Sequence, residues 1–313
     1  MQIFRSFEIP EDFLNSVIAI GNFDGVHLGH QAVLNKAKEI GLEKKIGVLT
    51  FEPHPKCFFN KEFDFFRLTP FREKYRILNQ FGIDFMINIK FDEKFLKKSA
   101  FEFISENLVN DLGVNTVVTG FDFVFGNKKV GDVNYINNFV KKTKKFQFFE
   151  VPEVKNNRGI EVSSSNIREF IRVGEVESAN LLLTRKWKIT GRVIRGEKKA
   201  REIGFKTANI KVNGYCNLKY GVYQVSIELP KKLESKVFFG IANFGIKPTF
   251  NKSEPLLEVH LFDFNKEIYN ERLEVTFHKF IRPEKKFESI VKLKDQIIKD
   301  INQVKNDRLF ENN

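Results

Sequence analysis

The sequence predicts an α/β chain with two structural units, a parallel sheet followed by an antiparallel barrel or sandwich. Short apolar runs alternate with helical patterns through the first half of the 313-residue chain, as in parallel sheets with crossover helices. From Trp187 onward, short strand-like runs follow one another, separated by Gly, Pro and Asn, which favours an antiparallel barrel or sandwich. A helical pattern over residues 287–301 closes the chain.

The first unit is expected to contain buried strands with helices between them. The strand-like runs cover residues 17–20, 46–51, 85–89, 116–119 and 146–151. The helical patterns cover residues 31–40, 73–81, 101–112 and 135–142. Ligands of such sheets bind at the carboxyl ends of the strands. We therefore expect the unusual segments at 21–30, 50–55 and 120–126 to meet at one edge of the sheet.

The second unit is expected to consist of short strands. Its alternating or apolar runs cover residues 188–194, 222–229, 237–242, 256–262 and 273–280. The pattern changes between Leu183 and Trp187, which predicts domains at residues 1–184 and 185–313. No low-complexity linker separates them, so we expect the two domains to be joined directly.

Composition narrows the classes of protein. The two cysteines provide no disulfide framework and are typical of a reducing compartment. No run approaches the ~18 apolar residues of a spanning helix, and the first residues lack a signal-peptide core. We therefore expect a soluble, cytoplasmic protein without a membrane partner. The formal net charge of +12 makes nucleic acid an alternative partner, but the lysines are scattered and form no concentrated stripe, so we expect none.

The run at residues 21–30 joins the first buried strand to the first helix. Glycine lets the backbone approach a ligand closely, and a helix start offers free N–H groups and partial positive charge to an anion. His27 and His30 are three residues apart and lie on one helix face, where both imidazoles can donate to phosphate oxygens. A metal pair and plain helix capping are the alternatives. Zinc is disfavoured because Cys57 and Cys216 form no Cys-x-x-Cys motif.

A second helix start lies at residues 162–168. Serine and asparagine are strong N-caps, and Asn166 with Glu169 makes a capping pair, so ordinary capping is one interpretation. The other interpretation is a second phosphate site, in which hydroxyls, backbone N–H groups and the Arg168 guanidinium face the phosphate groups of a ligand.

The complete run at 21–30 resembles the nucleotide-binding signature of the bacterial bifunctional riboflavin kinase/FAD synthetase (FMN adenylyltransferase) family. That family lies within the wider group of His-x-Gly-His nucleotidyltransferases. It also carries Ser-Ser-Thr-x-x-Arg where this chain has a serine at each of positions 163–165 and arginine at 168, and Ser165 keeps the hydroxyl. The resemblance implies catalytic roles for His27 and His30. It implies nucleotide contacts from Gly21, Asn22, Phe23, Asp24, Gly25, Gly29, Ser163, Ser164, Ser165 and Arg168.

The resemblance also extends to the segments at 50–55 and 120–126, which are similar to the family's flavin and adenine loops. It implies flavin contacts from His54, Pro55, Asp122, Phe123 and Phe125. Core packing is the alternative for the phenylalanines, and an ordinary loop position is the alternative for His54. The implied reaction is attack of the FMN phosphate on the α-phosphorus of ATP with loss of pyrophosphate. Such a nucleophile needs alignment and charge neutralisation rather than a strong base.

A second chemical site is indicated by Thr207 and Asn209, which share one face if this segment is extended. Both offer oxygen ligands that suit Mg²⁺, although an exposed Thr/Asn pair is the alternative on spacing alone. The segment resembles the Pro-Thr-Ala-Asn motif of riboflavin kinases, which implies that these two residues bind the metal. Lys206 stands where the family has Pro, and Ala200 where it usually has Gly.

The segment at 258–264 matches the family's Glu-Val-His-Leu-Phe-Asp-Phe completely. On a strand, Glu258, His260 and Phe262 share one face. A carboxylate that simply faces water is the alternative for Glu258. The resemblance implies instead that Glu258 is the general base for the 5′-hydroxyl of riboflavin, which then attacks the γ-phosphorus of ATP.

Together these features predict a bifunctional enzyme with an N-terminal Rossmann-like parallel-sheet nucleotidyltransferase domain and a C-terminal antiparallel β-barrel riboflavin kinase domain with a C-terminal helix. Its expected ligands are riboflavin, FMN, FAD and ATP, with Mg²⁺ as the metal and ATP as co-substrate. One alternative is an FMN adenylyltransferase with a weakened kinase half, motivated by Lys206 and Ala200. Another is an adenylyltransferase for a different phosphorylated cofactor precursor, which would have no use for a kinase barrel.

Overall fold

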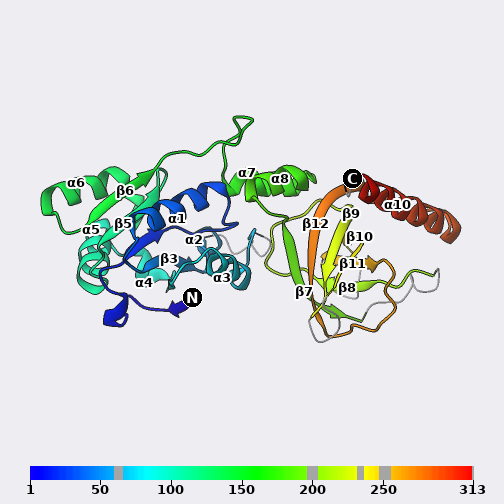
Figure 1. Ribbon diagram of the computed structural model, residues 1–313, viewed down its shortest axis with the longest axis horizontal. Helices are drawn as coiled ribbons and strands as arrows, with labels where there is room; N and C mark the ends of the chain where they lie inside the picture. The colour runs from blue at the N-terminus through cyan, green and yellow to red at the C-terminus, as the bar shows by residue number, and fades with distance from the viewer. Residues whose placement is uncertain (60–65, 196–203, 231–235, 247–254, 312–313) are drawn as a thin grey trace. The chain divides into compact units, whose positions relative to one another are not determined.

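A computed structural model of the protein describes residues 1–59, 66–195, 204–230, 236–246 and 255–311. The chain divides into two compact units, Met1–Ser164 and Ser165–Asn313. The expected fold class is confirmed, because a parallel sheet with helices occupies the first unit and a closed barrel occupies the second (Figure 1). Within the described residues, none of the helices has the length and apolar character needed to cross a membrane.

The first unit is built on a six-stranded parallel sheet with the strand order β1-β4-β3-β2-β5-β6. Its strands are β1 (Gln2–Phe4), β2 (Val17–Ile20), β3 (Ile46–Glu52), β4 (Phe85–Lys90), β5 (Thr116–Gly120) and β6 (Gln147–Val151). Its helices are η1 (Glu11–Phe13), α1 (Leu28–Ile40), α2 (Pro55–Phe59), α3 (Phe71–Gln80), α4 (Glu93–Leu96), α5 (Ala100–Glu102), η3 (Phe103–Asp111), η4 (Asn127–Lys129) and α6 (Val133–Thr143).

Apolar side chains of the helices cover both faces of this sheet. Successive side chains of a strand point to opposite faces, so each strand contributes to both layers. On one face, Val17 and Ala19 of β2 pack with the apolar stripe of α1 and with Leu78 of α3. On the other face, Ile18 and Ile20 pack with apolar side chains of η3, α6 and α4. The helix expected over residues 101–112 consists of α5 followed by the π-helical turns of η3.

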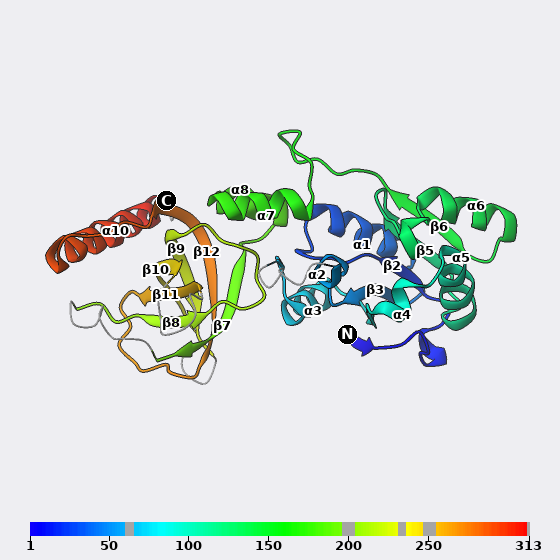
Figure 2. The same ribbon diagram turned by 180° about the vertical axis from the view of Figure 1, so that it is seen from behind.

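The second unit contains a closed six-stranded barrel with the strand order β10-β11-β8-β7-β12-β9, seen from the other side in Figure 2. Its strands are β7 (Lys188–Ile194), β8 (Ala208–Lys211), β9 (Gly221–Glu228), β10 (Val237–Ile246), β11 (Pro255–Leu261) and β12 (Arg272–Pro283). Helices α7 (Ser164–Val173) and α8 (Val176–Leu183) precede the barrel, and α10 (Ile290–Glu311) follows it.

Helix α8 is attached to the barrel through a buried asparagine. The Asn180 side chain donates to the carbonyl of Phe277 on β12 at 3.0 Å and accepts from the Trp187 N–H at 2.6 Å. Compact unit two therefore begins before α8, whereas the domain boundary expected from the sequence pattern lies after it. The division into functional domains at residues 184 and 185 stays a prediction.

Candidate active sites

A strained turn follows β2 at the carboxyl edge of the parallel sheet. Phe23, Gly25 and Val26 all have positive φ angles, of 50°, 91° and 41°. This conformation is costly for a β-branched residue such as valine, so the surrounding structure must hold it. The buried carboxylate of Asp24 accepts the backbone N–H of Leu68 at 3.1 Å and that of Thr69 at 2.9 Å.

The turn is held from the same side by the hydroxyl of Thr69, which accepts the N–H of Gly25 at 2.8 Å. From a third segment, Ser164 donates its hydroxyl proton to the carbonyl of Asp24 at 2.8 Å. The predicted nucleotide residues from 21 to 25 therefore form one fixed backbone structure, and the start of α7 at Ser164 lies against it. Ser165 and Arg168 follow on α7, within the second compact unit, and Ser163 precedes the helix.

His27 and His30 lie together at the start of α1. His27 is the N-cap, and its Nδ1 accepts the backbone N–H of His30 at 3.3 Å. An accepting Nδ1 carries no proton, so a neutral His27 has its proton on Nε2, where it can serve as a donor. The two rings stack with centroids 3.6 Å apart and an interplanar angle of 20°.

Gly29 lies close beneath this pair of histidines. A Cβ at position 29 would come within 3.2 Å of the His27 ring and of the Val162 carbonyl. A side chain here would require either the imidazole or the segment before α7 to shift by a few tenths of an ångström, so glycine suits this close contact.

The three unusual segments of the first unit leave the sheet at the same edge, as expected, because β3, β2 and β5 are adjacent and parallel. His54 is buried beside the ring of Phe66, and its Nδ1 accepts the Lys56 N–H at 3.1 Å. Pro55 begins the short helix α2.

Among the predicted flavin contacts after β5, Phe125 is buried and packs against Phe103 and Tyr135. Phe123 stacks on Phe125 with centroids 5.4 Å apart and remains half-exposed, and Asp122 is exposed. Phe125 therefore contributes to the core, whereas Phe123 and Asp122 keep surface that a ligand can reach.

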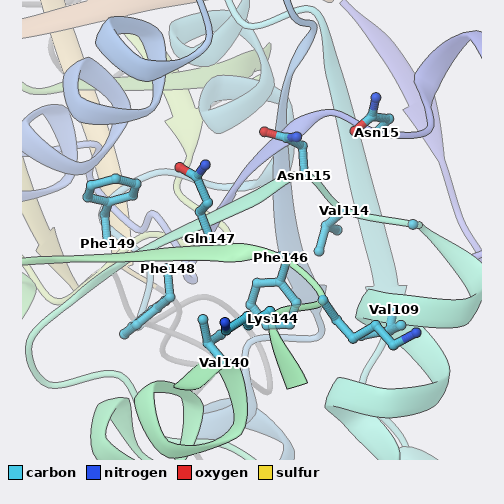
Figure 3. Close-up of a pocket in the computed structure, with 12 residues that line it drawn as sticks. Asn15, Val109, Val114, Asn115, Val140, Lys144, Phe146, Gln147, Phe148 and Phe149 are labelled. Atoms are coloured by element: carbon cyan, nitrogen blue, oxygen red, sulfur yellow. The ribbon is translucent and has the colours of Figure 1, made fainter. Parts of the chain in front are cut away.

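A cavity of about 680 Å³ opens at the opposite, amino-terminal edge of the sheet, beside the first residues of β5 and β6 (Figure 3). Its polar lining includes Asn15, Asn115, Lys144 and Gln147. None of the site residues expected from the sequence is among those that line it. The cavity is therefore separate from the carboxyl edge, where the glycine-rich turn lies.

In the barrel, a row of polar side chains crosses three neighbouring strands. Glu258 on β11 pairs directly with Asn209 on β8 and with Asn243 on β10. Asn243 in turn donates to Glu284, just beyond β12, at 3.3 Å. The neighbours of Glu258 along β11, Leu257 and Val259, are completely buried, so the expected alternation of faces is confirmed.

A cavity of about 90 Å³ adjoins this row and is lined by Lys206, Thr207 and Asn209. The backbone carbonyl of Lys206 accepts a hydrogen bond from Nδ1 of His260 at 2.9 Å. The ammonium of the same lysine donates to the side chain of Asn265 at 3.2 Å. The backbone before Thr207 is therefore fixed without a proline. Ala200 lies outside the described residues.

Sequence reasoning missed several residues that build these sites. Thr69 and Lys74 contact the glycine-rich turn from more than forty positions away, and no local pattern marks them. A role for Asn243 and Glu284 becomes visible only through the strand register, which places Asn243 opposite Glu258.

Comparison with known proteins identifies the chain. Residues 9–166 match the family model of FAD synthetase, and residues 183–307 match that of riboflavin kinase. The protein named bifunctional riboflavin kinase/FMN adenylyltransferase from Buchnera aphidicola subsp. Schizaphis graminum is 41% identical over 297 residues, covering 93% of each chain. The protein of the same name from Bacillus subtilis is 38% identical, covering 93% of this chain and 92% of its own. The chain belongs to this family.

A solved structure shares the fold of nearly the whole chain. A solved structure named macrolide-efflux protein, from Streptococcus pneumoniae, matches with a TM-score of 0.86 and 28% identity, covering 98% of this chain and 99% of that one. Its name differs from those of the curated relatives, although it shares the fold.

Proposed function

We propose that this protein phosphorylates riboflavin to FMN and adenylylates FMN to FAD, with ATP as co-substrate of both reactions. The observation that carries this proposal is the presence of two separately built sites in one chain, each inside the matching family segment. The close relatives named for both activities support it. The row of polar side chains around Glu258 on the barrel also argues against an adenylyltransferase for a different precursor, because such an enzyme would need no second site.

Adenylyl transfer is assigned to the turn after β2 and the start of α1. The FMN phosphate is already an anionic nucleophile, so the protein has to align it with the α-phosphorus and balance the charge that moves onto pyrophosphate. His27 and His30, stacked at a helix N-terminus, are suited to donate hydrogen bonds to those oxygens. The backbone from Gly21 to Gly25 is fixed before ATP binds, which lowers the entropic cost of binding.

Riboflavin phosphorylation is assigned to the polar row on the barrel. An alcohol is a poor nucleophile until its proton is removed, and a positioned base contributes about 10²–10⁴ in rate. Glu258 is the carboxylate at the centre of the row, flanked by Asn209 and Asn243 on the neighbouring strands. We assign to it the removal of the 5′-hydroxyl proton as the oxygen attacks the γ-phosphorus of ATP.

We propose that Thr207 and Asn209 hold Mg²⁺. Both line one small cavity, Asn209 pairs with Glu258 across the strands, and both offer neutral oxygen atoms, a donor type that Mg²⁺ accepts. This ion commonly uses few protein ligands and completes its shell with phosphates and water, so a small donor set fits. When bound, it would neutralise phosphate charge. In the described residues, no cluster of three or more His, Cys, Asp or Glu side chains is placed to hold a metal ion.

The structure bears on one of the two motives for the weakened-kinase alternative, the replacement of proline by Lys206. The hydrogen bond from His260 to the Lys206 carbonyl anchors the backbone that proline would otherwise stiffen. We therefore propose a working kinase half.

We also propose a cytoplasmic location, which is supported by the use of ATP and by the two cysteines, because they form no disulfide.

The test is incubation of purified protein with riboflavin, ATP and Mg²⁺, followed by chromatography of the flavins over time. FMN should appear first and FAD later, with ADP and pyrophosphate as the respective by-products. Chelation of the metal with EDTA should stop the first step, and excess Mg²⁺ should restore it. Absence of both flavin products from folded protein would overturn the proposal.

A further inference from the structure

The chemistry assigned above does not use Lys74, although this lysine is buried against the glycine-rich turn after β2, the turn assigned above to ATP. It lies on α3, and its side chain is 3% exposed. Its ammonium donates to the carbonyl of Asn22 at 3.2 Å and to the hydroxyl of Thr50 at 3.0 Å. It also lies 3.5 Å from the carboxylate of Glu52.

These contacts join three parts of the fold at one point. Asn22 belongs to the turn after β2, Thr50 and Glu52 belong to the end of β3, and Lys74 comes from the first turns of α3. The Thr50 hydroxyl donates to the same Asn22 carbonyl at 3.3 Å, so this oxygen accepts two hydrogen bonds. Both bonds fix the peptide that precedes Phe23, the first residue of the turn with positive φ.

A buried ammonium is costly, so its presence here requires compensation. Burial lowers the pKa of Lys74, and the neighbouring charge of Glu52 opposes that shift. Glu52 is itself held by a bidentate contact with Arg67. The charges are therefore arranged around a single backbone carbonyl, and a chain selected for stability alone could fill the same space with apolar side chains.

We propose that Lys74 is a positioning residue for the adenylyl-transfer site, which fixes the Asn22 carbonyl and so preforms the turn that receives ATP. The proposal rests on the function assigned above to this turn. Loss of the ammonium would leave the turn free to populate other conformations, and ATP would then bind only the competent fraction. Binding of FMN and the kinase reaction on the barrel do not depend on this carbonyl.

The test compares two lysine-to-methionine variants of the full-length protein. Lys74→Met keeps the length of the side chain and removes the donor. Lys38→Met is the matched control, because Lys38 also donates to a backbone carbonyl of the first unit, that of Phe81 at 3.0 Å, but away from the turn. Steady-state kinetics of FAD synthesis are measured against ATP and against FMN, and riboflavin kinase activity is measured in the same samples.

Lys74→Met should raise the KM for ATP in FAD synthesis by about tenfold or more, the loss expected for a hydrogen bond to a charged donor. The KM for FMN and the kinase rate should stay within about twofold, and Lys38→Met should match the parent. An unchanged KM for ATP, or equal losses toward ATP and FMN, would overturn the proposal.

A second variant keeps the proposal testable if Lys74→Met does not fold. Thr50→Val removes the hydroxyl that links the lysine to the turn and leaves the ammonium paired with Glu52. It should raise the KM for ATP selectively but by a smaller factor, and an unchanged value would count against the proposal. A parent protein that makes no FAD would contradict the assigned function itself, which separates the two failures.

Discussion

Asp24 holds the glycine-rich turn after β2 through its buried carboxylate, and Asp24→Asn tests this role directly. The substitution keeps the shape of the side chain and one accepting oxygen. The other oxygen becomes an amide nitrogen, which would face a backbone N–H of Leu68 or Thr69 with no acceptor between them. The site is almost completely buried, at 3% exposure, so water cannot readily replace the lost partner.

The magnitude follows from these contacts. A buried donor left without a partner costs about 1–3 kcal/mol, and we take about 2 kcal/mol for the single N–H that loses its acceptor. In a unit of about 150–250 residues, each 1 kcal/mol shifts the unfolding midpoint by roughly 2–4 °C. The first unit, Met1–Ser164, should therefore unfold about 4–8 °C lower in the variant.

The assay is thermal unfolding followed by circular dichroism, combined with FAD synthesis from FMN. Asp92→Asn is the control, because Asp92 also accepts a backbone N–H, at 3.0 Å, but as a half-exposed N-cap, where Asn and Asp are nearly equivalent. An Asp24→Asn protein that unfolds with the parent and synthesises FAD at the parent rate would refute the reasoning.

Two further predictions concern the barrel unit. Lys206→Pro should leave the rate of riboflavin phosphorylation within about threefold of the parent. In a double-mutant cycle, the loss of that rate caused by His260→Phe should be smaller in the Lys206→Pro background than in the parent, by about 1 kcal/mol. Strictly additive losses would show that His260 does not anchor the Lys206 carbonyl. A fragment of residues 165–313 should unfold at a higher temperature than one of residues 185–313, because only the longer fragment keeps Asn180 and its bonds to Phe277 and Trp187. Equal midpoints would show that α8 does not stabilise the barrel.

The sheet could be predicted from the sequence because each buried strand is a short apolar run with polar or glycine-rich ends. The run at residues 17–20 coincides with β2, and that at 188–194 coincides with β7. The edge strand β1 was missed because it has only three residues, without a buried pattern. The π-helical turns of η3 carry no signal that separates them from an α-helix in the pattern of apolar residues.

Local motifs predicted the candidate sites, but the contacts that support those sites are tertiary. The stacked pair of His27 and His30 follows from helical spacing. The hydrogen bond between Thr69 and Asp24 joins positions 45 residues apart, and that between Lys74 and Asn22 joins positions 52 residues apart. Such pairings depend on how β3 and α3 pack. A lysine on an amphipathic helix is ordinarily solvated, so no local pattern predicts that Lys74 is buried.

The central claim is that one chain holds two sites with separate catalytic residues, and the most direct measurement is the flavin product made by two complementary variants. Glu258→Gln should lose about 10²–10⁴ in FMN formation from riboflavin, equivalent to about 3–5 kcal/mol in the barrier, and still convert FMN to FAD at nearly the parent rate. The double variant His27→Ala/His30→Ala should form FMN normally and no FAD. If either variant, while folded, lost both activities together or neither, the account of two independent sites would be contradicted.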